Sequence, residues 1–189
     1  CVDCAGRGRG NLFGSARAAR PRQWGSVRVS AQTPVVTYAI IGVCVALWVG
    51  DILTKGVITQ YLGFTPIHGL YQPWRILTTA FLHVNLMHIA FNMVSLYAVG
   101  RALEPALGRG PYFCLYLLSA LGGTLGVLGW VLIDPSSALT VTVGASGAIF
   151  GLFGSVFVLQ RAAGIDVRAV AGLLAVNLLY GFIVSGVSW

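Results

Sequence analysis

The stretch FLHVNLMHIAFNM, residues 81–93, places His83, His88 and Asn92 inside a predominantly apolar run. Apolar runs of about 18 residues or more are typical of helices that cross a membrane. Polar side chains in the hydrocarbon core of a bilayer are unfavourable and often serve a function. We therefore interpret His83, His88 and Asn92 as candidates for a buried functional site.

The composition of the whole chain agrees with a membrane protein. Of its 189 residues, 57% are hydrophobic and only 9% are charged, whereas a soluble domain has about 25% charged residues. We predict an all-α polytopic helical bundle, whose membrane domain covers residues 34–189. The predicted spans are about 35–53, 76–100, 111–133, 145–160 and 167–187, and a polar turn is predicted at 100–111.

The segment 1–33 is rich in arginine and glycine, which predicts a flexible basic linker. Cys1 and Cys4 form a CxxC pair at its start, which is half of a structural zinc site. Two alternatives stay open: two thiols in a flexible tail, or the remnant of a zinc-binding extension. Because the chain begins without Met and stops directly after an apolar run, we interpret it as a fragment. We expect no nucleic-acid partner.

The distribution of Lys and Arg predicts the orientation in the membrane. With five spans, ten of these residues fall on the side of the N-terminus and two, Lys55 and Arg75, fall on the other side. We therefore expect a plasma-membrane protein with a cytoplasmic N-terminus. Residues 81–93 and the start of the fourth span then lie in the outer half of the bilayer, which suggests one shared site that opens to the outside.

Helical spacing separates the three polar residues of the opening stretch. His88 and Asn92 are four residues apart and share a face, whereas His83 and His88 differ by about 140° in direction on a continuous helix. This spacing is unsuited to two histidines binding one metal ion, for which four residues is the useful separation. The pair of His88 and Asn92 could donate hydrogen bonds at a functional site or only join neighbouring helices.

A second polar stretch, TVGASGAIFGLFGS (142–155), places Ser146 between Gly144 and Gly147 at the predicted start of a helix. Together with Gly151 and Gly154, these glycines lie on one helical face and allow close packing of a neighbour. One interpretation is a packing stripe alone. The other is a serine nucleophile at a helix N-terminus, where backbone N–H groups face a developing oxyanion.

These motifs resemble those of rhomboid intramembrane serine proteases of the bacterial type. HVNLMHIAFN (83–92) resembles their HxxxxHxxxN, GASG (144–147) their GxSG, and Trp74–Arg75 their WR; Glu104 with Gly108 resembles their ExxxG. The resemblance implies that Ser146 is the nucleophile and that His88 and Asn92 stabilise the oxyanion. It implies structural support by His83, Trp74, Arg75, Glu104, Gly144 and Gly147.

The sequence departs from the family at the general base, a histidine on a sixth span. The three histidines are His68, His83 and His88, so we expect a chain truncated before the sixth core helix and inert as it stands. The resemblance implies cleavage of single-span membrane proteins near the outer face of the membrane, without a catalytic cofactor; the lipid bilayer is the expected surrounding partner. An inactive rhomboid-like scaffold or chaperone stays open. A small transporter would show repeated halves, and the sequence shows none.

Overall fold

The computed structural model describes residues 33–69 and 71–183, and helices make up most of this part of the chain. Each long helix coincides with an apolar segment of the sequence. The elements, in chain order, are α1 (Val35–Leu53), α2 (Val57–Leu62), α3 (Pro66–Gly69), α4 (Arg75–Thr78), the 3₁₀ turn η1 (Thr79–Phe81), α5 (Leu86–Leu107), α6 (Arg109–Val131), the 3₁₀ turn η2 (Pro135–Leu139), α7 (Ser146–Ala162) and α8 (Arg168–Ile183).

The five longest helices, α1, α5, α6, α7 and α8, correspond to the five predicted spans. Three of them, α1, α5 and α6, are long and apolar enough to cross a membrane, and α7 is a shorter apolar helix. The prediction of an all-α polytopic membrane protein is confirmed.

The second predicted span, 76–100, differs from the structure at both ends. The chain leaves η1 at Leu82 in an extended conformation, and α5 begins only at Leu86. Asn85 ends the interruption, because its side chain accepts a hydrogen bond of 2.8 Å from the backbone N–H of His88. Such a cap satisfies a donor that the first turn of a helix leaves without a partner. The apolar pattern continues across this break and therefore hides it.

The predicted polar turn at 100–111 is wrong. Helix α5 continues through Pro105 to Leu107, and α6 starts at Arg109, so only Gly108 separates them. Gly108 has φ of +87°, a left-handed conformation that favours glycine. The charged residues of this segment suggest a loop, but the side chain of Glu104 is 2% exposed and lies buried inside the bundle.

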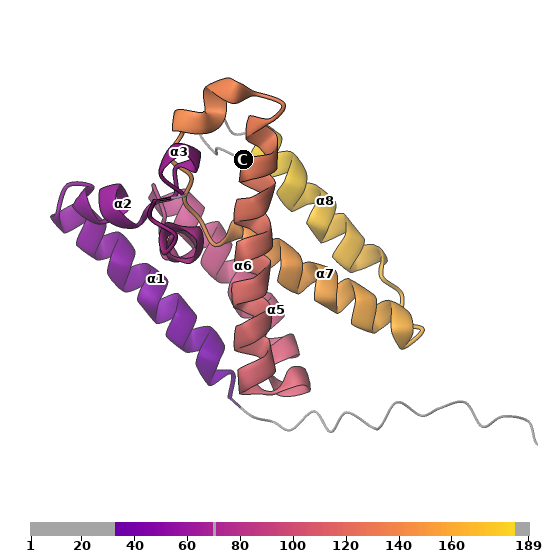
Figure 1. Cartoon of the computed structure of the whole chain (residues 1–189). Helices are drawn as coiled ribbons and strands as arrows, with labels where there is room; N and C mark the ends of the chain where they lie inside the picture. Colours follow the sequence, from indigo (N-terminus) through magenta and orange to yellow (C-terminus); the bar gives the residue numbers. More distant parts are fainter. Residues whose placement is uncertain (1–32, 70, 184–189) are drawn as a thin grey trace, which may run out of the picture.

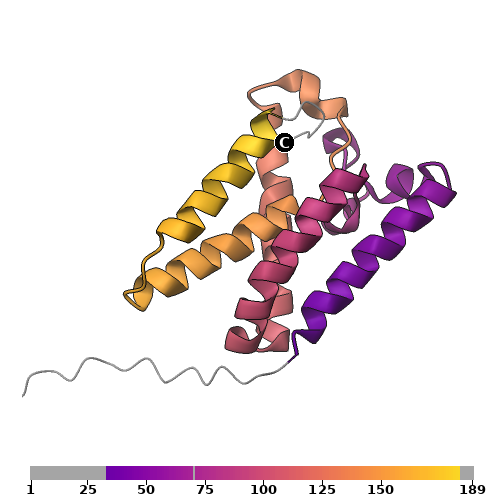
Figure 2. The same ribbon diagram turned by 180° about the vertical axis from the view of Figure 1, so that it is seen from behind.

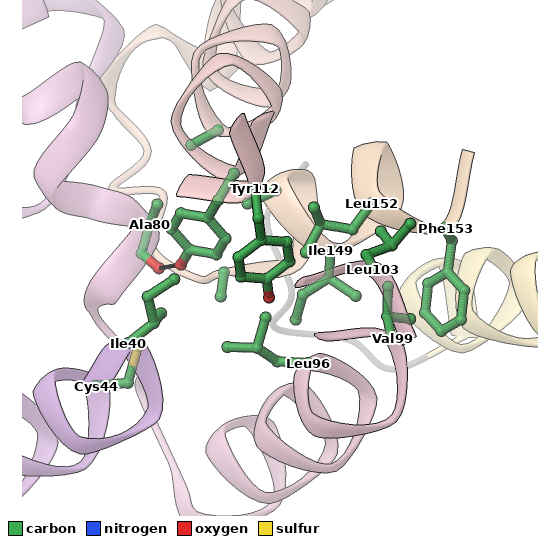
Figure 3. Packing of buried hydrophobic residues seen from close by; sticks show 14 residues of the cluster. Ile40, Cys44, Ala80, Leu96, Val99, Leu103, Tyr112, Ile149, Leu152 and Phe153 are labelled. Carbon is green, nitrogen blue, oxygen red and sulfur yellow. Dashed lines mark hydrogen bonds between the residues drawn. The ribbon is translucent and has the colours of Figure 1, made fainter. Parts of the chain in front are cut away.

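The helices are arranged as a bundle with α6 at its centre (Figure 1). Helix α5 lies beside both α1 and α7, and α8 packs against α7 at the edge of the bundle (Figures 1 and 2). The core combines aliphatic residues of α1, α5 and α7 with Tyr112 and Tyr116 of α6 (Figure 3). The Tyr116 hydroxyl donates a hydrogen bond of 3.0 Å to the carbonyl oxygen of Ala80, which ties α6 to η1.

Helix α1 is fixed to α5 by a carboxylate that caps it from another helix. The backbone N–H groups of Val36 and Thr37 and the Thr37 hydroxyl each donate a 2.8 Å hydrogen bond to Glu104. A β-carbon on Gly100 would lie 2.3 Å from the Thr37 hydroxyl oxygen, so only glycine permits this approach. A negative charge at a helix N-terminus also complements the helix dipole.

Helices α6 and α7 touch through their backbones. A β-carbon on Gly123 would lie 2.9 Å from the Cα atom of Gly147, and one on Gly147 would lie 3.0 Å from the Cα of Gly123. One turn along α7, Gly151 packs against Ser119, whereas Gly154 has no such neighbour within 4 Å. The glycine face of α7 therefore packs closely over two turns, and this contact fixes the depth of Ser146 in the bundle.

Candidate active site

Ser146 is the first residue of α7 and is half-buried. The segment before it is held in place from two sides. Thr142 forms an antiparallel β-bridge with Phe64, and the backbone N–H of Gly144 donates a 3.0 Å hydrogen bond to the carbonyl oxygen of Thr79. The Thr79 hydroxyl also donates to the carbonyl oxygen of Thr142. The loop and η1 thus position the start of α7.

The N-terminus of α7 offers backbone donors to a ligand. Its N-cap residue is Ala145, which has no side chain able to cap the helix, and the first intrahelical hydrogen bond comes from Ile149. The N–H groups at the first positions of a helix lack intrahelical partners and favour negative charge. Those of Ser146 and Gly147 are therefore suited to a developing oxyanion beside the Ser146 hydroxyl.

The imidazole of His88 converges with Ser146 on the same point. A β-carbon on Gly144 would lie 2.8 Å from Nε2 of His88 and 3.7 Å from Oγ of Ser146. Gly144 also has φ of +136°, a conformation that other residues rarely adopt. Gly144 thus lets two side chains from different helices approach one position.

Asn92 lies one helical turn after His88, on the same face as predicted from the sequence. Its side chain is 7% exposed, and Nδ2 donates a 2.8 Å hydrogen bond to the carbonyl oxygen of His88. An asparagine amide has two N–H donors, and within the described residues only this one bond is made. The second donor is available to a ligand.

His88, Asn92 and Ser146 line one cavity of about 590 Å³ between α5, α6 and α7. The cavity has the size of a small-molecule site. Other residues with hydroxyl groups also line it, among them Ser95 and Ser119, together with Phe91 and several glycines of α6. The structure therefore brings the three predicted chemical groups into one largely apolar cavity inside the bundle.

His83 does not lie on the helix that carries His88, so the difference of about 140° in direction, which helical spacing predicts, does not apply to this pair. Because α5 starts at Leu86, His83 precedes it, and the two imidazole rings meet edge to face with centroids 5.1 Å apart. His83 is 2% exposed, and neither of its ring nitrogens has a hydrogen-bond partner among the described residues. His83 therefore packs directly against the ring of His88.

Arg75 organises the loop from α2 to α4. Its side chain is 7% exposed, and Nη1 donates to the carbonyl oxygens of Gln60 and Gly63, at 2.8 Å and 2.6 Å. Nε donates to the side-chain oxygen of Gln72. These carbonyls belong to the C-terminal end of α2, where a cation is favourable. The neighbouring Trp74 is 52% exposed.

Sequence reasoning missed three residues that position the site: Thr79, Asn85 and Thr142. Asn85 carries a readable signal, because an asparagine three residues before His88 is a typical N-cap. The contact between Thr79 and Thr142 joins residues 63 positions apart and has no local signal.

The described residues contain no group of three or more His, Cys, Asp and Glu side chains that could hold a metal ion. The CxxC pair of Cys1 and Cys4 lies outside the described residues. A zinc ion there stays a prediction.

The fold and the cavity define a class: a multi-pass helical membrane protein with a serine, a histidine and an asparagine in an intramembrane cavity. The sequence model of one protein family, the rhomboid domain, matches residues 70–189 of this chain. The chain belongs to the rhomboid family.

Several curated proteins are similar in sequence. The chain is 33% identical over 122 residues to rhomboid protease GluP of Bacillus subtilis, an alignment that covers 60% of this chain and 22% of that protein. It is 36% identical over 129 residues to the putative rhomboid protease YdcA of the same species, an alignment that covers 64% of this chain and 60% of that protein. It is 29% identical over 154 residues to rhomboid protease GlpG of Yersinia enterocolitica, an alignment that covers 79% of this chain and 52% of that protein. The chain thus spans 60% or less of the length of these relatives.

Proposed function

We propose that this chain carries the nucleophile and the oxyanion site of a serine-type intramembrane endopeptidase. The observation that carries the proposal is the convergence of His88 Nε2 and Ser146 Oγ at Gly144, inside a cavity between membrane-spanning helices. The names of similar proteins, rhomboid proteases GluP and GlpG, agree with this chemistry.

In the proposed reaction, Ser146 Oγ attacks the carbonyl carbon of a substrate peptide bond. The serine proton passes to a general base and then to the leaving amine, and water hydrolyses the acyl-enzyme. The negative charge on the carbonyl oxygen is stabilised by Nε2–H of His88, the free N–H of Asn92 and the backbone N–H of Ser146. His88 acts as a donor here, so its proton is on Nε2.

The general base is assigned to a histidine outside this sequence. Serine needs an adjacent base to become nucleophilic. Within the described residues no group forms a hydrogen bond with the Ser146 hydroxyl, and His83 contacts His88 instead. The proposed base therefore comes from another part of the protein, as the family resemblance implies.

The substrates proposed are single-span membrane proteins, cut near the outer face of the plasma membrane. The ratio of ten to two in Lys and Arg supports a cytoplasmic N-terminus. A reporter fused before residue 35 is then cytoplasmic, and one inserted in the loop between α1 and α4 is external. The opposite labelling would contradict the orientation.

A fluorophosphonate probe tests the nucleophile directly. In the protein expressed from its complete gene, the probe labels wild type and fails to label Ser146→Ala, which also loses cleavage of a membrane-anchored reporter. Ser155→Ala on the same helix is the matched control, because its hydroxyl is used in a 2.9 Å hydrogen bond to the carbonyl oxygen of Gly151. Unchanged cleavage by Ser146→Ala would leave the alternative of an inactive scaffold and a contaminating protease.

A further inference from the structure

A second, polar cavity of about 310 Å³ lies in the loop that joins α1 to α4, apart from the intramembrane cavity. Arg75 forms part of its wall, together with hydrogen-bonding side chains of the loop and one residue of the segment before α7. The lining residues are Thr59, Gln60, Tyr61, Thr65, His68, Gln72, Arg75 and Val141.

The guanidinium of Arg75 is only partly used by the protein. Its Nε and Nη1 hold the loop, whereas no described residue accepts a hydrogen bond from Nη2. An arginine has five N–H donors in a planar fork, and two of them are on Nη2. The cation is thus buried, and part of its donor capacity is available at the wall of the cavity.

No carboxylate lines this cavity in the described part of the chain. Asp51, an acidic residue near the end of α1, already has partners. Its carboxylate accepts hydrogen bonds from the backbone N–H and the hydroxyl of Thr59, at 2.8 Å and 2.7 Å. Arg75 forms no ion pair among the described residues. A buried cation with carbonyl and amide partners only is incompletely compensated, so the cavity favours an anion.

The position of the loop identifies the kind of anion. Helix α1 crosses the membrane and ends at Leu53, so the loop that follows lies at the level of the lipid headgroups. Tyr61, Tyr71 and Trp74 on this loop are 64%, 82% and 52% exposed. Exposed aromatic side chains of this kind concentrate where a membrane protein meets the headgroups.

We propose that this cavity binds the phosphate of a phospholipid headgroup, with Nη2 of Arg75 as the charged donor and His68 and Thr65 as neighbouring donors. Phosphate oxygens match the planar fork of an arginine. Val141 lines this cavity, and the adjacent Thr142 and Val143 line the intramembrane cavity. A bound lipid therefore contacts the segment that positions Gly144 and Ser146.

The test replaces His68, because substitution of Arg75 would also release the carbonyls of α2. The His68 side chain is exposed and makes no hydrogen bond within the described residues, while its backbone carbonyl holds the loop in any variant. His68→Glu places a carboxylate at the cavity, where it repels phosphate and competes for Arg75. Ile67→Glu adds the same charge one residue away, at an exposed position that does not line the cavity.

Native mass spectrometry of the full chain in detergent measures binding of dioctanoyl-phosphatidylglycerol, of dioctanoylglycerol, which lacks phosphate, and of inorganic phosphate. We expect wild type to bind the phosphatidylglycerol and to bind dioctanoylglycerol at least tenfold more weakly. His68→Glu lowers the affinity for the phosphatidylglycerol at least tenfold, and Ile67→Glu changes it less than twofold. The rise in melting temperature caused by this lipid, a second readout, disappears in His68→Glu only.

Two results would overturn the proposal. Equal binding of both lipids would show that acyl chains alone are recognised, and wild-type affinity in His68→Glu would place the lipid elsewhere. Inorganic phosphate is expected to compete with the lipid at high concentration. Binding of inorganic phosphate without binding of the lipid would identify a soluble anion and would also overturn it.

Discussion

Nε2 of His88 lies 2.8 Å from the position that a β-carbon on residue 144 would occupy. This distance is shorter than real β-carbon contacts, so a larger residue at position 144 would require the ring of His88 to shift. Gly144, the first glycine of the GASG motif, is therefore favoured by a neighbour from another helix as well as by its own backbone conformation.

Gly144→Ala should displace the His88 ring and strain the backbone. An alanine held in an unfavourable region of φ and ψ costs about 1–3 kcal/mol. We expect a loss of this size in the free energy of unfolding and a fall in cleavage of at least tenfold, measured in detergent on the protein expressed from its complete gene. Gly154→Ala is the control. It has open space around its β-carbon position and lies within α7, so alanine should leave activity unchanged and stabilise the helix by up to about 1 kcal/mol.

Gly123→Ala should separate α6 from α7, because the added β-carbon would meet the backbone of Gly147 at 2.9 Å. Overpacking of this kind typically costs about 1–3 kcal/mol. Thermal unfolding in detergent measures the loss. Gly129→Ala on the same helix has no neighbour within 4 Å and should be neutral or mildly stabilising. Equal melting temperatures for the two variants would show that the helices can move apart without loss.

Glu104→Ala should detach the N-terminus of α1. It removes all three hydrogen bonds to Val36 and Thr37 and leaves buried donors without partners. Each hydrogen bond to a charged group contributes about 1.5–3 kcal/mol, so the melting temperature should fall strongly. Glu104→Gln keeps one acceptor oxygen and should lose roughly half as much stability. If the glutamine variant is as unstable as the alanine variant, the carboxylate charge at the helix terminus is the decisive feature.

Arg75→Lys and Trp74→Ala separate the two residues of the WR pair. Lysine keeps the charge but cannot reach Gln60, Gly63 and Gln72 together, so we expect a loss of about 1–3 kcal/mol in stability. Trp74 is half exposed, and its removal should cost less, with a partial loss of activity. Complete loss of cleavage in a well-folded Trp74→Ala protein would assign the indole a direct role.

The sequence predicts the parts of this structure that depend on local pattern. Five apolar segments become five long helices, and the GASG motif starts α7 at Ser146 as expected from glycines around a serine at a helix N-terminus. Helical spacing also places His88 and Asn92 together, since both lie within one continuous helix.

The remaining features depend on contacts between distant residues. The break before Leu86 lies in an unbroken apolar pattern and is visible only through the cap at Asn85. Glu104 reads as a loop residue until its partners on α1, 67 and 68 positions away, are known. The ring contact between His83 and His88 follows from that break. On one continuous helix the two side chains would point in different directions, whereas in the structure their rings touch.

Asn92→Leu and His88→Leu decide whether these residues stabilise an oxyanion or only join helices. Interhelical hydrogen bonds in membranes contribute about 0.6 kcal/mol on average, so residues with only that role should affect stability slightly and leave kcat near normal. Removal of an oxyanion donor typically lowers kcat about 10²–10³-fold. The measurement is kcat on a membrane-anchored reporter, together with the melting temperature in detergent.

The two variants should differ in degree. His88→Leu removes the imidazole that faces Ser146 across Gly144, and it should lower kcat by about two orders of magnitude or more. Asn92→Leu should have a smaller effect, at least tenfold, because His88 and the Ser146 backbone remain as donors. It also frees the carbonyl oxygen of His88 from the 2.8 Å bond to Nδ2, although that carbonyl keeps its place in the helix. Normal turnover with a lowered melting temperature in both variants would make this pair a packing element, and the oxyanion would then be stabilised by the α7 backbone alone.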